Sequence, residues 1–209
     1  MSLADKLAHG VLELGLQMSA DVQAKLLDYL QLIAKWNRVH NLTAVRDSDQ
    51  MVSAHLLDSL AIVPHLRAGS VLDVGSGAGL PGIPLALMWP QASITLLDSN
   101  HKKAAFLRQA VIELKITNAT VVCERVESWQ PPQAFDVVIS RAFSDLPEFV
   151  RLAGRLCKPD GRVVAMKGIY PNEELAQLPG NFVVEKTLPL KVPGMTAERH
   201  LVLLNPAAA

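Results

Sequence analysis

The first part of the chain places its hydrophobic residues at helical spacing. In residues 19–37 the apolar positions share one helical face, Ser19 suits the N-cap, and Asp21 falls in the first turn. Similar patterns cover residues 3–16 and a stretch from about Ser48 to Pro64. Because no glycine-rich linker follows, we expect residues 1–66 to form a helical extension packed on a main domain of residues 67–209.

After Gly69 the pattern changes to short apolar runs that alternate with helical patterns. The runs that predict strands are residues 70–74, 93–98, 119–123, 135–140, 161–168, 182–190 and 199–204. The patterns that predict helices between them are residues 80–88, 102–114, 146–157 and 172–178. Near-continuous apolar strands are typical of a parallel sheet covered on both faces, and the alternation predicts a doubly wound α/β domain. The last two strands have no helix between them, so we expect an antiparallel hairpin through Pro193-Gly194.

Composition and charge narrow the picture only slightly. Half of the 209 residues are hydrophobic, yet no run approaches the roughly 20 apolar residues that a membrane helix needs. Two cysteines are too few for a disulfide framework. We therefore expect a cytoplasmic monomer without a metal. Twenty basic residues balance twenty acidic ones, so bulk charge gives no argument for nucleic acid; basic clusters in residues 101–108 and 141–168 form either a basic face or ordinary solvated helix surfaces.

The segment Val71–Pro84, "VLDVGSGAGLPGIP", contains a dinucleotide fingerprint when read literally. Gly77, Gly79 and Gly82 satisfy G-x-G-x-x-G, and Asp98 follows 21 residues after the first of them. This pattern keeps a nicotinamide-dependent dehydrogenase open as an alternative. Asp98 does not discriminate, because a carboxylate at the end of the second strand binds ribose hydroxyls in either kind of site.

The same segment also contains Asp73-x-Gly75-x-Gly77-x-Gly79, a pattern that methyltransferases use to hold S-adenosylmethionine. This cofactor has no phosphate, so an acid at the end of the first strand is useful: Asp73 can orient the loop backbone or meet the ammonium group of the methionine moiety. In a dinucleotide site the strand would run directly into Gly77, but residues 74–76 intervene. The residues therefore favour S-adenosylmethionine.

Several further motifs accompany the glycine loop. In chain order the motifs are "WNRVHNLT", "HLLDSL", "DVGSGAGLPGIPLA", "LLDS", "ISRAF", "MKG" and "ERHLV". Together they closely resemble the bacterial family that methylates N7 of a guanine in 16S ribosomal RNA, formerly called glucose-inhibited division protein B. The resemblance covers nearly the whole chain. It implies a class I S-adenosylmethionine-dependent methyltransferase, Rossmann-like, with a mostly parallel seven-stranded sheet, and 16S ribosomal RNA as substrate in the small-subunit context.

The resemblance also implies site residues. Gly75 and Leu80 match positions that contact the cofactor, and Val126 and Glu127 match positions on its adenine side. Arg141, directly after the fourth strand, matches another position of the cofactor pocket, and we expect it to be catalytic. The alternatives are core packing for Val126 and a surface ion pair for Arg141.

The residue types after the fourth strand are consistent with transfer to a ring nitrogen. Methylation at carbon 5 of a pyrimidine needs a cysteine nucleophile, but Cys123 and Cys157 lie elsewhere and are expected to be buried packing residues. An exocyclic amine commonly needs Asp/Asn-Pro-Pro-aromatic where residues 140–143 read "SRAF". Guanine N7 carries a free lone pair and needs no base, only in-line positioning. Ribose methylation with Lys167, and a noncatalytic assembly factor that only binds the cofactor, remain open.

The contacts with RNA are expected at the same edge of the sheet. Phe143 is a candidate for stacking on a base, although a core position is the alternative. Lys167, Arg199 and His200 are candidates for phosphate or base contacts. Polar residues on the N-terminal helices are expected to cap helices or brace the cofactor loop rather than bind substrate: Asn41, His55, Asp58 and Ser59.

Overall fold

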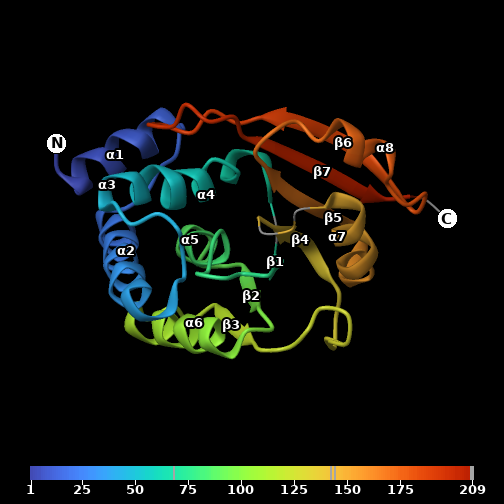
Figure 1. Ribbon diagram of the computed structural model, residues 1–209, viewed down its shortest axis with the longest axis horizontal. Coiled ribbons are helices and arrows are strands. Elements are labelled where there is room, and N and C mark those ends of the chain that lie inside the picture. Colours follow the sequence, from blue (N-terminus) through green and yellow to red (C-terminus); the bar gives the residue numbers. More distant parts are fainter. Residues whose placement is uncertain (68, 142, 144, 208–209) are drawn as a thin grey trace.

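The computed structural model describes residues 1–67, 69–141, 143 and 145–207. Its centre is a seven-stranded sheet in the order β3-β2-β1-β4-β5-β7-β6 (Figure 1). The strands are β1 (Ser70–Val74), β2 (Ser93–Leu97), β3 (Ala119–Val122), β4 (Phe135–Ser140), β5 (Cys157–Lys167), β6 (Phe182–Pro189) and β7 (His200–Pro206). Neighbouring strands from β3 to β5 are parallel, whereas β7 is antiparallel to β5 and β6. The expected α/β sheet with an antiparallel C-terminal hairpin is confirmed.

Helices cover both faces of this sheet. The α-helices are α1 (Leu3–Glu13), α2 (Ala20–His40), α3 (Ser48–Met51), α4 (Asp58–Leu60), α5 (Gly82–Met88), α6 (His101–Glu113), α7 (Leu146–Ala153) and α8 (Asn172–Ala176). The other helical elements are η1 (Val52–Leu57), η2 (Val63–His65) and η3 (Gly154–Leu156). In the described part of the chain, no helix is both long and apolar enough to cross a membrane.

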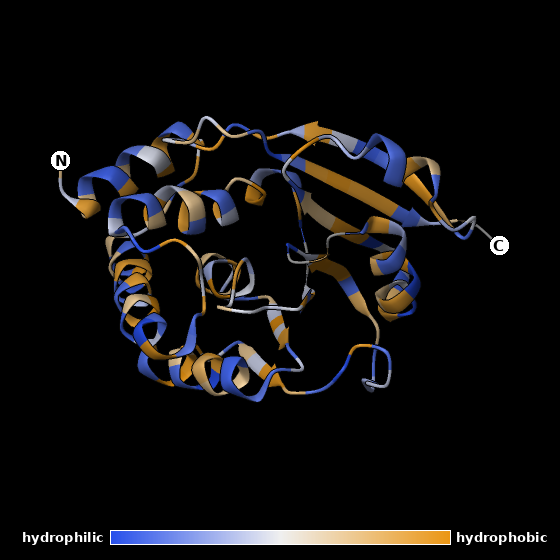
Figure 2. Cartoon of the chain, in the orientation of Figure 1, coloured by the Kyte–Doolittle hydropathy of each residue, from blue (hydrophilic) through white to orange (hydrophobic). Residues whose placement is uncertain are grey.

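Successive residues of the strands belong to two different hydrophobic layers, because successive side chains of a strand point to opposite faces of the sheet. Along β4, Val137 and Ile139 join the layer formed with α1, α2, α5 and α6, whereas Val138 joins the layer formed with α7. Figure 2 shows strands that are hydrophobic along most of their length, packed between helices that have both hydrophobic and hydrophilic residues. Leu26 of α2 and Leu85 of α5 belong to the same buried layer, so the N-terminal helices share the core of the sheet.

Several element boundaries differ from expectation. The third predicted helix contains the π-helical turn η1, Val52–Leu57. The helix after β1 begins at Gly82 instead of Leu80, because the backbone N–H groups of Gly79 and Leu80 both bond the carbonyl of Ser76 in a tight turn. The helix predicted over residues 146–157 ends at Ala153 and continues as η3, and β5 then begins at Cys157.

Candidate active site

The loop after β1, residues 75–81, owes its shape to three glycines; we call it the cofactor loop. Gly75, Gly77 and Gly79 have φ angles of 69°, 59° and 87°, in the left-handed region that side chains disfavour. At the end of β2, Asp98 accepts hydrogen bonds from the backbone N–H of Gly77, at 2.9 Å, and of Asn100, at 2.8 Å. The loop is thus tied to the neighbouring strand end, and its backbone is open to a ligand.

Asp73 braces this loop from inside the protein. Its side chain is fully buried, and Oδ2 accepts the backbone N–H of Gly82 at 2.9 Å. Oδ1 has no hydrogen-bonding partner among the described residues. Burial raises the pKa of Asp73 from its ordinary value of 3.8 to about 7, against the opposing effect of the Gly82 hydrogen bond. Asp73 therefore orients the loop backbone, which is one of its two expected roles. It is too deeply buried to bind the ammonium group of the cofactor directly, which is the other.

Gly82, which completed the dinucleotide fingerprint, is required by packing. A Cβ atom there would lie 2.2 Å from Cδ2 of Leu96 and 2.7 Å from Oδ2 of Asp73. The residue therefore lets the start of α5 lie directly against β1 and β2. The coincidence of this close approach with the spacing of Gly77 and Gly79 explains the match to a dinucleotide site.

Replacement of Gly82 by alanine should therefore destabilise the protein. Overpacking of a filled core typically costs about 1–3 kcal/mol, and the bond between Gly82 N–H and Asp73 would be distorted as well. Chemical denaturation measures the effect. Gly180, where a Cβ would meet nothing within 4 Å, supplies the control. Equal stability of Gly82→Ala and Gly180→Ala would contradict this account of the loop.

The N-terminal helices also hold the cofactor loop. The hydroxyl of Tyr29, in α2, donates to the carbonyl of Ala78, and the Tyr29 side chain is fully buried. A Cβ on Gly79 would lie 3.1 Å from this hydroxyl. The sequence offered no signal for this contact beyond an aromatic residue with a polar tip on an apolar helical face.

A pocket of about 230 Å³ opens beside the loop; we call it the cofactor pocket. It is lined by Val74, Gly75, Leu97, Asp98, Ser99, Glu124, Arg125, Val126, Glu127, Phe143, Glu148 and Leu152. Gly75, Asp98, Val126 and Glu127 therefore converge as expected, whereas Arg141, which was also expected here, does not line this pocket. Val126 also packs in the core, as the alternative interpretation expected, and its contact with the cofactor stays a prediction. Leu80 is 3 % exposed and packs in the other hydrophobic layer.

Phe143 lies in this cofactor pocket, although we expected it to be an RNA contact. Its ring packs on Phe149 of α7, with the ring centroids 5.1 Å apart. The turn of residues 126–129, which begins in this pocket, is held by Arg155, whose role the sequence did not reveal. Its guanidinium donates to the carbonyls of Val126 and Trp129, at 2.8 and 2.6 Å.

The charges around the cofactor pocket test which cofactor fits. Four carboxylates, those of Asp98, Glu124, Glu127 and Glu148, line it against a single arginine, Arg125. Such a site repels a pyrophosphate and attracts a cation. The sulfonium and ammonium groups of S-adenosylmethionine suit this environment, and the apolar walls suit its adenine. The residues present therefore fit S-adenosylmethionine better than a dinucleotide.

A second pocket, of about 260 Å³, lies at the carboxyl ends of β4 and β5; we call it the arginine pocket. It is lined by Asp58, Arg141, Met166, Lys167, Gly168 and Arg199. Because Gly75 follows β1 and Arg141 follows the adjacent β4, the two pockets flank the point where strand order reverses. Ligands of doubly wound sheets bind at this point.

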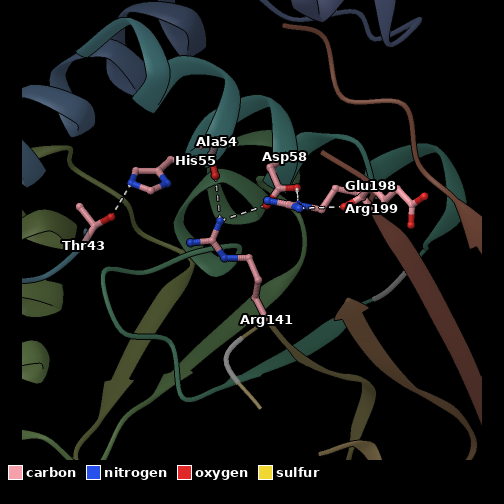
Figure 3. A network of polar contacts seen from close by, with 7 residues as sticks. All are labelled: Thr43, Ala54, His55, Asp58, Arg141, Glu198 and Arg199. Carbon is pink, nitrogen blue, oxygen red and sulfur yellow. Dashed lines mark hydrogen bonds and ion pairs between the residues drawn. The ribbon is translucent and has the colours of Figure 1, made fainter. Parts of the chain in front are cut away.

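Asp58 joins two arginines in the arginine pocket (Figure 3). Oδ2 of Asp58 accepts from Nη1 of Arg141 at 3.1 Å, and Oδ1 accepts from Nε of Arg199 at 2.9 Å. Nη1 of Arg141 also donates to the carbonyl of Ala54 at 3.1 Å. The ion pair considered for Arg141 is present, but it lies inside the pocket. The expectation that Asp58 caps a helix is wrong, because both its oxygens bind arginines.

Lys167 and His200 border the arginine pocket but have partners of their own. Nζ of Lys167 lies 2.7 Å from a carboxylate oxygen of Glu174. Nδ1 of His200 lies 2.8 Å from the carbonyl of Gly168, and its ring meets that of Tyr170 edge-on at 5.5 Å. Both residues lie where the sequence placed them, next to Arg199.

The basic cluster of residues 141–168 does not form an unpaired basic face. Arg155 bonds backbone carbonyls, as described above, and the remaining cations bind carboxylates. These ion pairs are Arg141–Asp58, Arg151–Glu148, Lys158–Asp136, Arg162–Glu185 and Lys167–Glu174. The fold brings three of these acids from distant parts of the sequence, which the local charge count could not reveal: Asp58, Asp136 and Glu185.

Other polar candidates on the N-terminal helices form a separate network. Nε2 of His55 and the hydroxyl of Thr43 lie 2.9 Å apart, and Asn37 bonds both the N–H and the carbonyl of Thr43. Burial lowers the pKa of His55. Asn41 ends α2 in the left-handed conformation, in agreement with a capping role. The buried Ser59 hydroxyl has no partner among the described residues.

The cysteines differ from each other. Cys157 is buried, as expected, but the expectation is wrong for Cys123, which is half-buried with its sulfur 3.4 Å from Nδ1 of His101. A larger hollow of about 1050 Å³ lies along α2, between α1 and the residues before β3. It is lined by lysines, acids and leucines and lies away from the two pockets, so we do not consider it the active site.

Known proteins resemble this chain over nearly its whole length. The model of the family GidB, described as rRNA small subunit methyltransferase G, matches residues 22–202. A protein named ribosomal RNA small subunit methyltransferase G from Laribacter hongkongensis is 56 % identical over 205 residues, covering 98 % of this chain and 99 % of that protein. One of the same name from Pseudomonas aeruginosa is 53 % identical over 206 residues, covering 98 % and 96 %.

Solved structures share the fold at low identity. The O-methyltransferase TomG from Streptomyces achromogenes, in complex with SAM, matches with a TM-score of 0.61 and 16 % identity over the full length of both chains. The mitomycin 7-O-methyltransferase MmcR matches with a TM-score of 0.63 and 17 % identity, over 76 % of this chain and 56 % of that one. The expected class I methyltransferase fold is confirmed, and the dehydrogenase alternative is excluded. The chain belongs to the rRNA small subunit methyltransferase G family.

Proposed function

We propose that this protein transfers a methyl group from S-adenosylmethionine to N7 of a guanine in 16S ribosomal RNA. The observation that carries the proposal is the pairing of an acidic, glycine-lined cofactor pocket with an arginine pocket across the reversal point of the sheet. Family membership supplies the substrate class, because the relatives are named for the small-subunit ribosomal RNA.

The residues of the cofactor pocket divide its tasks. The backbone of Gly75 approaches the methionine moiety, Gly77 and Gly79 shape the loop behind it, and Asp98 accepts from the ribose hydroxyls. Val126 and Phe143 contact the adenine, with Glu127 at the rim. We therefore reassign Phe143 from RNA to cofactor. S-adenosylmethionine, when bound, supplies an electrophilic methyl group on a positively charged sulfur.

The arginine pocket provides binding and orientation rather than acid–base catalysis. Its lining residues that could accept a proton, Asp58 and Lys167, are both held in ion pairs. The N7 lone pair forms the new bond to the methyl carbon while the bond from that carbon to sulfur breaks, and no proton has to leave N7. Arg141 and Arg199 donate to the base, and Lys167 and His200 lie on the path of its backbone. In-line positioning is the main contribution to rate.

Mass mapping of 16S ribosomal RNA tests the substrate. We expect one N7-methylguanine to be absent from a strain that lacks the gene and to return when the gene is restored. If every N7-methylguanine persists in the deletion strain, the assigned acceptor is wrong. Methyl transfer by the pure protein to purified small subunits excludes a noncatalytic assembly factor, and naked 16S RNA as a parallel substrate shows whether the assembled particle is recognised.

Asp98→Asn should weaken the binding of S-adenosylmethionine. The carboxylate holds the Gly77 N–H and, in the proposal, the ribose; hydrogen bonds to charged groups contribute about 1.5–3 kcal/mol, so we expect a Kd about 10- to 100-fold higher by calorimetry. Asp136→Asn removes a carboxylate paired with Lys158 at the start of β4 and serves as the control. Equal affinities of the two variants would remove Asp98 from the cofactor site.

We further propose that the protein acts as a monomer, without a metal, and that residues 1–66 depend on residues 67–209 to fold. The buried layer that Leu26 shares with Leu85 supports this dependence, because each part covers apolar surface of the other.

A further inference from the structure

A buried carboxylate on the N-terminal helices needs an explanation beyond packing. The side chain of Asp58 is 2 % exposed, and its neighbours Leu56, Leu57 and Leu60 are completely or almost completely buried. A carboxylate in such surroundings is unfavourable unless it is paired and hydrogen-bonded. A residue that serves only the helix core would more favourably be apolar.

We infer that Asp58 is a positioning residue, which fixes the orientation of Arg141 and Arg199 toward the acceptor base. The inference rests on the proposed function. Each oxygen of Asp58 binds a different arginine, and these arginines come from the end of β4 and the start of β7. Both arginine side chains are about a quarter exposed, 27 % and 26 %, whereas the carboxylate is not. The guanidinium groups therefore form the accessible face of the pocket, and Asp58 forms its fixed base.

The hydrogen bonds define which edge of each guanidinium faces a ligand. Nη1 of Arg141 donates to both Ala54 and Asp58, which uses its two N–H bonds and leaves the edge formed by Nε and Nη2. Arg199 is held through Nε by Asp58 and through Nη1 by the carbonyl of Glu198, which leaves Nη2. Figure 3 shows both groups anchored to the helix in this way.

This anchoring resolves a conflict in the recognition of guanine. A free arginine commonly donates to O6 and N7 of guanine together. Such a bond would occupy the N7 lone pair that must attack the methyl group. Arginines held by one edge can bind O6 while N7 stays free. Asp58 also offsets one of the two positive charges near the purine, which becomes cationic on methylation.

Asp58→Asn tests this role with little change of shape. The amide removes the buried charge and presents N–H groups to one arginine, so both guanidinium groups can turn. We expect kcat for methyl transfer to purified small subunits to fall about 10- to 100-fold, as for a misplaced reactant. The affinity for S-adenosylmethionine should stay within about twofold, because neither Asp58 nor the two arginines line the cofactor pocket. Asp136→Asn, a carboxylate paired with Lys158 away from both pockets, should retain kcat.

A double-mutant cycle separates positioning from general stability. If Asp58 acts through the arginines, Asp58→Asn combined with Arg199→Gln should lose no more kcat than the worse single variant, because coupled residues are not additive. Additive losses would overturn the inference. So would an unchanged kcat, or an Asp58→Asn protein that does not fold or bind S-adenosylmethionine. Wild-type protein that methylates no N7 position would instead refute the proposed function.

Discussion

Arg141→Ala should lower the rate of methyl transfer about 100-fold or more, the loss expected when a base is no longer held in line. Arg141 lines the arginine pocket directly beside the cofactor loop and is anchored there by Asp58 and Ala54. The fold should survive, because Asp58 keeps its bond to Arg199. Single-turnover assays on purified small subunits, with S-adenosylmethionine in excess, measure this effect.

The matched control is Arg162→Ala, which removes an arginine from an ion pair with Glu185 on the outer strands. It should leave the rate unchanged. If Arg141→Ala also retains the wild-type rate, Arg141 does not belong to the site, whatever its effect on stability.

Asp73→Asn should stabilise the protein at neutral pH. The pKa of Asp73 is about 7 in the folded protein and 3.8 is its ordinary value, so the folded state retains a proton that the unfolded state loses between these pH values. Stability contributed by Asp73 therefore falls as the pH rises from about 4 to about 7 and is constant above. Three units of pKa correspond to about 4 kcal/mol. Asparagine carries no charge and can still accept the Gly82 N–H, so the free energy of unfolding of the variant should rise by up to this amount.

Denaturant unfolding at several pH values between 4 and 8 measures the difference between Asp73→Asn and wild type. Asp136→Asn provides a control of opposite sign, because the hydrogen bond from Lys158 lowers the pKa of that carboxyl. Its carboxylate stabilises the fold above the ordinary pKa, so its loss should destabilise at neutral pH. Parallel stability curves for wild type and Asp73→Asn would contradict the assigned pKa.

The sheet could be predicted from sequence because its signals are local. Apolar runs of strand length alternate with helical patterns from β1 to β5, except between β3 and β4, and these periods follow from burial on two faces. The glycines of the cofactor loop were equally visible, since only a few residue types adopt their backbone angles. The sequence did not reveal where α5 starts, because the tight turn on the Ser76 carbonyl leaves no periodic pattern of apolar residues.

The arginine pocket could be predicted only in part. Arg141 and Arg199 were found because they flank strands, but their shared partner Asp58 lies 83 and 141 residues away along the chain. A single acid within the apolar run "HLLDSL" was the available signal, and capping was the simpler interpretation. Within residues 141–168, three cations are neutralised in a way that the sequence could not show for the same reason, because the acidic partners of Arg141, Lys158 and Arg162 are distant in sequence.

The hydroxyl of Tyr29 and the carboxylate of Asp58 come from the same set of N-terminal helices, yet one binds the loop after β1 at Ala78 and the other binds the arginine pocket. Residues 1–66 are therefore difficult to exchange for the corresponding segment of another protein. A chimera that exchanges them for the helices of another methyltransferase would have to keep both contacts in register, or neither the loop nor the arginine pocket would be correctly supported.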